Sequence, residues 1–242
     1  MEENKFPTET VELPSKGVVY PPDHPLRSGK VEMKYMTAKE EDILTNQNYI
    51  KKGIVLDKLL DSLVMGKFDI KELVTGDKNA LLISSRILGY GKDYTFSYDG
   101  TEYTVDLTEL DNKPFDETKV TPRGTFMFTL PATGTKVEFK LLNDKDNETI
   151  DQENESMKKF NKDSSSEVTI RLKHQIVSVE GDNDKNSIRS FVEQMLAQDS
   201  RALRKYIKDI SPDVNLSTSV KINDVEESID IPISLSFFWP DL

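Results

Sequence analysis

The chain has 242 residues, and its 43 Asp and Glu outnumber its 32 Lys and Arg to give a net charge of −11. Such a charge disfavours a general nucleic-acid-binding protein, whose footprint is basic. The absence of cysteine excludes a disulfide framework, a thiolate zinc site and a cysteine nucleophile. No apolar run reaches the roughly 18 residues that span a bilayer, so we expect no membrane span. The length fits one large domain or two small ones.

The first 30 residues predict an extended arm. Five prolines between positions 7 and 25 exclude a continuous helix or a central strand, because proline lacks a backbone N–H. Apolar residues between Val11 and Tyr20 indicate one hairpin-like bend in this arm. We expect the arm to dock on its own domain, and contact with a partner is the alternative.

Residues 31–92 predict a compact helical unit that opens with a strand. Apolar and polar residues alternate in Lys30–Met36, which is typical of a half-buried strand. Thr37 and Glu40 then have the spacing of a capping box, which predicts a helix running towards Leu44.

Two further helices complete this unit in the sequence. Ile54–Val64 has apolar residues at helical spacing, and Gly66 follows as the expected stop. Asp77–Leu88 predicts a third helix, which we expect to be capped by Asp77 and ended by Gly89.

Residues 93–142 predict a region of β-hairpins. Alternating residues on either side of Asp99-Gly100 indicate a first hairpin, since Asp-Gly is a strong signal for a two-residue turn. Thr125–Leu130 and Lys136–Leu142 predict a second hairpin across the Pro131–Gly134 turn. The following residues, 143–166, form a polar insertion that fits either a charged helix or a mobile segment. We favour a partial helix with frayed ends.

The last part of the chain, residues 167–242, predicts a strand, a long helix and a terminal hairpin. Glu167–Val179 alternates and then shifts phase at Ile176, which indicates a strand with a bulge. Apolar residues at helical spacing predict one long helix over Asn186–Ile210. Val220–Trp239 predicts the hairpin, so the chain as a whole predicts an α+β fold.

A calcium loop is the most tempting ligand site in the sequence. Asp182, Asp184 and Asn186, with Glu193 further on, supply oxygen ligands at suitable offsets. Ser187 occupies the position where the sharp turn of such a loop needs glycine. We therefore favour an ordinary turn with a helix cap, and a calcium module is the minor alternative.

No constellation of residues points to catalysis or to a cofactor. His24 and His174 have no spacing that joins them to a metal set, and we expect both side chains to face solvent. The sequence contains neither a phosphate-binding GxxxxGK[ST] loop nor a GxSxG nucleophile elbow. We therefore predict a protein that is not an enzyme, with no catalytic, cofactor or metal residues.

Two features are unusual for a merely soluble domain. Phe237, Phe238 and Trp239 place three aromatic rings beside the carboxyl terminus, either in the core or as an anchor for a partner. Arg86 lies in a mostly apolar helical segment, where a guanidinium needs a nearby carboxylate or backbone carbonyls.

Four segments at both ends of the chain and in the helical unit have a recognisable order and spacing. They are VELPSKGVVY at Val11–Tyr20, MTAKEEDIL at Met36–Leu44, the GDKNALLI and RILGYG stretches within Gly76–Tyr94, and FFWP at Phe237–Pro240. Together they resemble the baseplate hub assembly proteins of T-even-like contractile-tailed bacteriophages.

The resemblance implies a non-enzymatic factor that helps to assemble the central hub of the phage baseplate. It would act in the host cell cytoplasm by binding hub and tail proteins, and whether it forms a homo-oligomer is open. A permanent structural subunit of the hub, present in the virion, is the alternative. We predict partner contacts at the arm turn and at the aromatic terminus, namely at Leu13, Pro14, Lys16, Tyr20, Phe237, Phe238 and Trp239.

Overall fold

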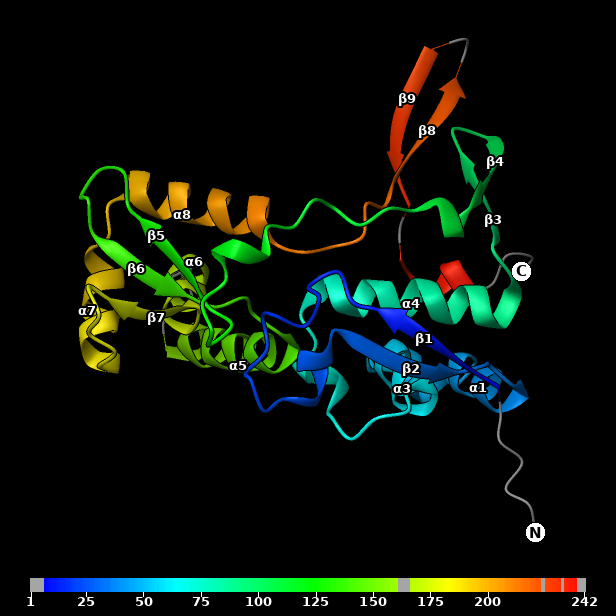
Figure 1. The fold of residues 1–242 in the computed structure, drawn as a ribbon, viewed down its shortest axis with the longest axis horizontal. Coiled ribbons are helices and arrows are strands. Elements are labelled where there is room, and N and C mark those ends of the chain that lie inside the picture. The colour runs from blue at the N-terminus through cyan, green and yellow to red at the C-terminus, as the bar shows by residue number, and fades with distance from the viewer. Residues whose placement is uncertain (1–6, 161–165, 223–224, 232, 239–242) are drawn as a thin grey trace.

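The computed structural model describes residues 7–160, 166–222, 225–231 and 233–238. Helices and small antiparallel sheets of two or three strands make up these residues (Figure 1). The fold is therefore α+β, as the sequence predicts.

The N-terminal arm docks on its own chain. Its strand β1 (Thr8–Glu12) pairs antiparallel with β2 (Lys30–Lys34), and Val11 lies opposite Val31. Leu13 and Tyr20, in the bend between the strands, are almost fully buried. The arm docks on its own chain as predicted, but it is less extended than predicted, because turns and a 3-10 helix, Pro25–Ser28, lie between β1 and β2.

The helical unit follows the arm. It consists of α1 (Ala38–Leu44), α2 (Gln47–Lys51), α3 (Val55–Leu63) and α4 (Thr75–Tyr90). Glu40 accepts a hydrogen bond from the backbone N–H of Thr37 at 2.9 Å, as its capping-box position predicts. The predicted bounds of α4 were wrong at both ends. The helix begins two residues before Asp77, whose carboxylate is bonded elsewhere, and it runs through Gly89 to end before Gly91.

The first predicted hairpin is confirmed in full. Strands β3 (Asp93–Tyr98) and β4 (Thr101–Asp106) pair antiparallel and without a break in register. Asp99 and Gly100 connect them, with φ values of 48° and 76°. Positive φ at both turn positions is what a two-residue hairpin turn of this hand requires.

The second hairpin belongs to a three-stranded sheet. Its strands β5 (Phe126–Thr129) and β6 (Lys136–Phe139) pair as predicted, and β7 (Ile176–Val179) adds to the other edge of β6. The polar insertion between β6 and β7 is largely the helix α5 (Asp144–Phe160), so the predicted helical segment is confirmed.

Two predictions for the last third of the chain were wrong. Glu167–Val179 is not one strand, because α6 (Glu167–Gln175) precedes β7. Ile170 of α6 packs with Leu142 and Ile150, so packing against α5 favours the helix over the strand.

The predicted long helix is two helices, α7 (Lys185–Gln194) and α8 (Ala197–Ile210). The backbone between them, at Met195 and Leu196, is extended. Asp199, in the first turn of α8, accepts hydrogen bonds from the backbone N–H groups of Ala132 and Thr133. This contact holds the start of α8 on the β5–β6 turn, where a helix continuing straight from α7 would not lie.

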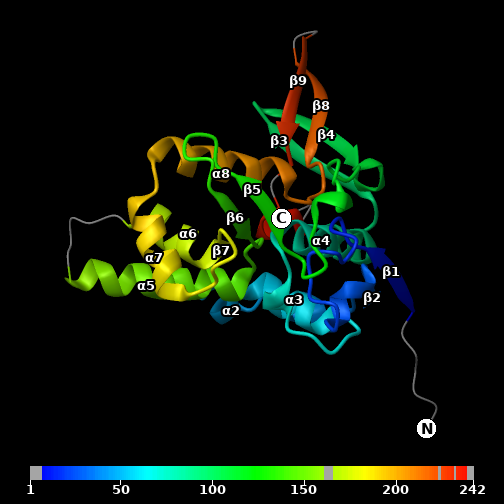
Figure 2. The ribbon, with the colours of Figure 1, turned by 60° about the vertical axis from the view of Figure 1, so that its left-hand side comes forward.

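The terminal hairpin is present, but it lies over Ser217–Asp230 and not over the predicted Val220–Trp239. Strands β8 (Ser217–Ile222) and β9 (Val225–Asp230) pair antiparallel and project from the body of the molecule on the same side as β3 and β4 (Figure 2). A short 3-10 turn, Leu235–Phe238, then returns the chain to the interior beside α4.

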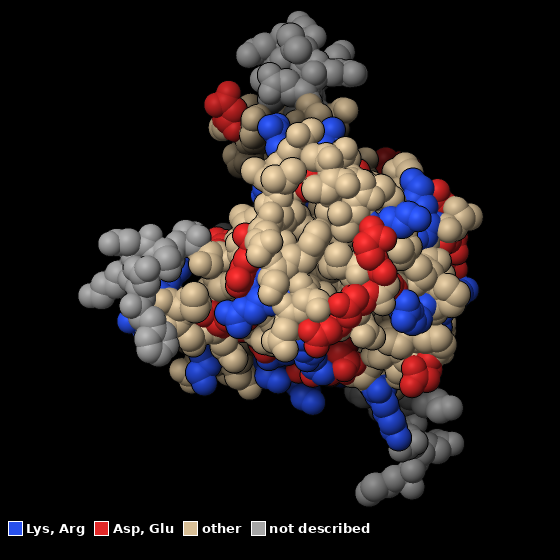
Figure 3. All heavy atoms as spheres, turned by 90° about the vertical axis from the view of Figure 1, so that its left-hand side faces the viewer, with Lys and Arg blue, Asp and Glu red and all other residues tan. Residues whose placement is uncertain are grey.

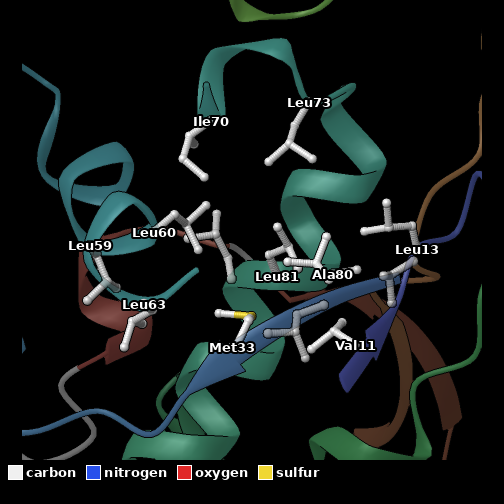
Figure 4. Packing of buried hydrophobic residues seen from close by; sticks show 14 of the residues in the cluster. Val11, Leu13, Met33, Leu59, Leu60, Leu63, Ile70, Leu73, Ala80 and Leu81 are labelled. Carbon is white, nitrogen blue, oxygen red and sulfur yellow. The ribbon is translucent and has the colours of Figure 1, made fainter. Parts of the chain in front are cut away.

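The buried apolar residues form two main clusters. The first joins the arm, α1 to α4 and the C-terminal turn, and Figure 4 shows Leu60 of α3, Met33 of β2 and Leu81 of α4 pointing toward one another. The second lies between the β5-β6-β7 sheet and helices α6 to α8. Val19 and Leu141 pack against both clusters and connect them. Each fully buried leucine contributes roughly 1.5–3 kcal/mol to folding.

Candidate interaction site

The predicted contact residues of the arm turn are mostly inside the molecule. Leu13 and Tyr20 are 1% and 4% exposed, and Pro14 is buried between them. Lys16 is exposed and forms an ion pair with Glu117 at 2.6 Å. The first three side chains are turned away from solvent on the folded chain, and a partner role for all four residues stays a prediction.

A buried carboxylate, Asp77 at the start of α4, holds the arm turn in place. Its Oδ1 accepts the backbone N–H of Ser15 at 2.9 Å. Its Oδ2 accepts the hydroxyls of Ser15 and Tyr20, each at 2.6 Å. The Tyr20 hydroxyl in turn accepts the backbone N–H of Val74 at 3.1 Å. Burial raises the pKa of Asp77 against the opposing effect of these donors, and it also raises the pKa of Tyr20.

The backbone of the turn is equally constrained. Lys16 and Gly17 have φ values of 51° and 77°. A Cβ on Gly17 would lie 2.5 Å from the carbonyl oxygen of Arg27, so only glycine fits. The Arg27 guanidinium donates to the carbonyls of Val18 and Tyr20 at 2.7 and 2.8 Å. The Leu13–Tyr20 segment is therefore a clamp that attaches the arm to α4.

The prediction that both histidine side chains face solvent was wrong. The half-buried ring of His24 stacks on Tyr20 at 5.4 Å between centroids, and its Nε2 lies 3.0 Å from a carboxylate oxygen of Glu72. His174 lies on α6 instead of a strand, 2.9 Å from a carboxylate oxygen of Glu153. Both rings have a structural role because each joins segments that are separate in the sequence.

The aromatic terminus is part of the core. Phe237 and Phe238 are fully buried and pack edge to face at 5.5 Å, and Phe237 also contacts Tyr94 at 4.8 Å. Of the two alternatives from the sequence, the core position is the correct one for these two residues. Contact of these two residues with a partner stays a prediction. Trp239 lies outside the described residues.

Arg86 ties this terminus to α4. Its guanidinium is fully buried and donates to three carbonyl oxygens, those of Phe237 at 3.0 Å, Gly91 at 3.0 Å and Asp93 at 3.3 Å. It also lies 5.2 Å from the ring centroid of Tyr90. Backbone carbonyls were one of the two kinds of partner expected for this residue.

The suspected calcium segment forms the turn with a helix cap that we favoured. Asp184 caps α7 by accepting the backbone N–H of Ser187 at 2.8 Å, and Asp182 accepts that of Asp184 at 2.9 Å. The backbone N–H of Asp184 and, after it, the side chain of Ser187 hold the pKa of Asp182 below its usual value. Within the described residues, no three His, Asp or Glu side chains are grouped so that they could hold a metal ion.

A groove that we did not predict from the sequence lies between the two projecting hairpins, β3–β4 and β8–β9. Its volume is about 530 Å³, and its walls come from β4, the turn after β4 and the base of β8. The lining residues are Tyr103, Thr104, Val105, Asp106, Glu109, Leu110, Ser217, Thr218 and Ser219. Each hairpin could be predicted from its own residues, but their meeting is a tertiary contact with no local signal.

The face on the α7 side does not present a patch of one charge. Figure 3 shows acidic and basic side chains interspersed around a broad uncharged area on it. The large exposed apolar side chains belong to different elements, and include Met65 after α3, Met127 on β5 and Leu196 between α7 and α8. Scattered apolar residues of this kind are normal on a protein surface.

None of the helices in the described part of the chain is both long and apolar enough to cross a membrane.

Comparison with known proteins gives one match. The model of a family described as T4 bacteriophage base plate protein matches residues 7–239. No curated protein and no solved structure matches the chain. The family match agrees with the resemblance to baseplate proteins of T-even-like phages, whereas a place in hub assembly is a finer statement than the match makes.

Proposed function

Because the chain belongs to this family of T4 bacteriophage base plate proteins, we propose that it helps to assemble the central hub of the baseplate by binding hub subunits. The observation that carries the proposal is the family match, which extends over nearly the whole described chain. A role in baseplate structure or assembly follows from membership, and the hub is the finer part that we propose.

The proposed mechanism is contact with other proteins and not catalysis. The arm clamp and the C-terminal turn use their buried polar groups to join the chain to itself, and within the clamp the exposed residue is Lys16. The two projecting hairpins instead present exposed side chains, among them Tyr98, Glu102 and Ser217. Hairpins of this kind suit a protein that holds hub subunits in an assembly-competent state and covers their adhesive surfaces.

Recovery of partners from infected cells tests the proposal. We expect the tagged chain to retain hub proteins from the host cytoplasm and to be missing from purified virions. Retention of no tail protein would overturn the proposed function. A matched bait with the β8–β9 hairpin shortened at its tip controls for adhesion of hub proteins to the body of the chain.

A permanent subunit of the baseplate is the second candidate, and the family description itself favours it. Mass spectrometry of purified virions separates the two. A stoichiometric amount of the chain in mature particles, together with hub proteins in the pull-down, would establish the structural subunit in place of the transient factor.

A further inference from the structure

The outer edge of β4 has unpaired backbone groups. Leu107 donates its N–H to the carbonyl of Lys92 at 2.9 Å, and this bond fixes the phase of the β3–β4 ladder. In an antiparallel pair the residues alternate between facing the partner strand and facing away. The backbone N–H and C=O of Thr104 therefore point outwards, as do those of Glu102 and Asp106. Among the described residues, no hydrogen bond reaches the outward groups of Thr104.

This edge opens into the groove between the hairpins. Four consecutive residues of β4, Tyr103 to Asp106, line one wall, and Ser217 to Ser219 of β8 line another. The short hydroxyl side chains of β8 leave space beside the strand. A volume of about 530 Å³ falls within the roughly 300–1,000 Å³ of ligand-binding clefts.

The edge also lacks three common blocks against pairing. Open edges are commonly blocked by proline, lysine or a bulge. The β4 sequence TEYTVD contains neither of these residues, and its register with β3 is regular. The outer edge of β3 differs, because Arg86 donates to the carbonyl of Asp93 there. A two-stranded hairpin gains stability from a third strand, and β4 is the side on which one fits.

The charge of the groove selects the kind of strand. Its lining includes Asp106 and Glu109 and contains no lysine or arginine. Asp106 is already paired with Lys92, on which Glu109 also acts, and Glu109 itself is exposed and forms no salt bridge within the described residues. Glu102 adds a third carboxylate on the exposed side of β4. These groups favour a segment that carries Lys or Arg.

A second copy of this chain fits the edge poorly. Symmetric antiparallel pairing about Thr104 would place Glu102 of each copy opposite Asp106 of the other. Like charges directly opposite one another destabilise a strand pair. This repulsion disfavours a second copy paired about Thr104, and a different chain suits the edge better.

We propose that β4 is a docking edge, to which an extended, lysine- or arginine-bearing segment of a partner protein adds as a third strand. Main-chain hydrogen bonds to Thr104 supply the affinity, and Glu102 and Glu109 supply the selectivity. That the partner is a baseplate protein rests on the proposed function, but the site itself does not.

A pair of proline variants tests the edge. Thr95 and Thr104 lie opposite each other, and their hydroxyls are 2.8 Å apart. Thr104→Pro and Thr95→Pro thus lose the same side-chain contact, and each removes an N–H that points to an outer edge. Only Thr104 faces the groove. The probe is a fluorescent eight-residue peptide of alternating Lys and Val, and its control has Glu in place of Lys.

We expect Thr104→Pro to weaken binding of the Lys peptide by about tenfold, since one edge hydrogen bond is lost. Thr95→Pro should leave the dissociation constant within about twofold, because the outer edge of β3 takes no part in binding. Amide hydrogen exchange on the wild-type chain measures protection by the peptide without any substitution. The Lys peptide should slow exchange at Thr104 and leave exchange at Thr95 unchanged.

Several outcomes would overturn the proposal. Equal weakening of binding by both proline variants would show that the β4 edge is not the binding site. Equal binding of the Lys and Glu peptides would show that the groove does not select by charge. No protection of Thr104 by the Lys peptide would remove the site. Weakening by Ser219→Pro but not by Thr104→Pro, with Ser228→Pro as the matched control, would move the added strand to β8.

The test is separate from that of the proposed function, because the titration uses the isolated chain. Failure to recover hub proteins from infected cells would overturn the hub role and leave the peptide result standing. Sedimentation of the chain alone checks the occupant. If the chain forms a dimer and Thr104→Pro abolishes it, the occupant of the β4 edge is a second copy. That result would overturn the proposal that a different protein supplies the added strand.

Discussion

Asp77 and Arg86 lie on the same helix, α4, and fasten opposite ends of the chain to it with opposite chemistry. Asp77 accepts hydrogen bonds from the arm, at Ser15 and Tyr20. Arg86 donates to carbonyls, including that of Phe237 near the other end. A proton can neutralise the carboxylate, whereas the guanidinium stays charged in proteins. One attachment therefore depends on pH and the other does not.

The two attachments should also differ in how much stability is lost when each is broken. The donors around Asp77 are two hydroxyls and one N–H of the arm, and a hydroxyl can rotate towards another acceptor. The acceptors around Arg86 are carbonyls fixed by the backbone at Gly91, Asp93 and Phe237. Groups that cannot reorient stay unpaired when their partner is removed, so the C-terminal attachment should be the more sensitive one.

The largest effect should come from Arg86→Ala. This change leaves three carbonyls without their donor and opens a space beside Tyr94, so we expect a loss of about 3–5 kcal/mol in the free energy of unfolding. Urea denaturation measures it. Arg189→Ala is the matched control, because the Arg189 side chain is 64% exposed and should change stability by less than about 0.5 kcal/mol. Equal effects of the two changes would contradict the role given to Arg86.

Tyr20→Phe should give the next largest effect. The change removes one donor from Asp77 and one acceptor from Val74 while keeping the buried ring. We expect a loss of about 1.5–3 kcal/mol, the range for a hydrogen bond to a charged group. Tyr98→Phe, at an exposed position in β3, is the control and should be neutral. A neutral Tyr20→Phe would mean that the hydroxyl contributes nothing to the clamp.

The pH dependence separates the two attachments. Burial raises the pKa of Asp77 above its ordinary 3.8, so the folded chain binds a proton where the unfolded chain has released one. Stability contributed through Asp77 therefore falls as the pH rises above 3.8. In urea denaturation across this interval, the free energy of unfolding of the wild type should rise relative to that of Asp77→Asn as the pH is lowered. The difference between wild type and Arg86→Ala should stay constant, and a constant difference for Asp77→Asn would refute the assignment.

Lys16→Ala should give the smallest effect on stability. Its ion pair with Glu117 joins side chains that are 62% and 42% exposed, so we expect a loss below about 0.5 kcal/mol. If Lys16 contacts a partner as predicted, recovery of hub proteins should fall while the melting temperature stays the same. Unchanged recovery would end the partner role of the arm turn.

Elements whose signal is local could be predicted from the sequence. The Asp99-Gly100 turn, the Thr37–Glu40 capping box and the alternation in β2 each depend on residues within a few positions of one another. The helix α6 could not be predicted, because apolar residues at Val168, Ile170 and Leu172 fit a strand equally well. Contact with α5 decides between the two, and that contact is tertiary.

The burial of the arm turn and of the aromatic terminus was missed for a related reason. Ser15 and Asp77 are 62 positions apart, and Arg86 and Phe237 are 151 apart. No residue near Leu13 or Phe237 in the sequence indicates that a polar partner lies so far away along the chain. Apolar residues beside a terminus therefore resembled a docking surface, although they fill the core. The open edge of β4 was overlooked because an unpaired edge becomes visible only when the neighbours of a strand are known.

The attachment of both chain ends to α4 has a consequence for the order of synthesis. The first apolar cluster includes Val11 and Phe238, so it is incomplete until Phe238 has left the ribosome. The second cluster draws its buried residues from the continuous stretch 126–203. That stretch is inserted within the first cluster, and its own core is fully translated earlier. The part of the chain that is made first is thus the part that finishes folding last.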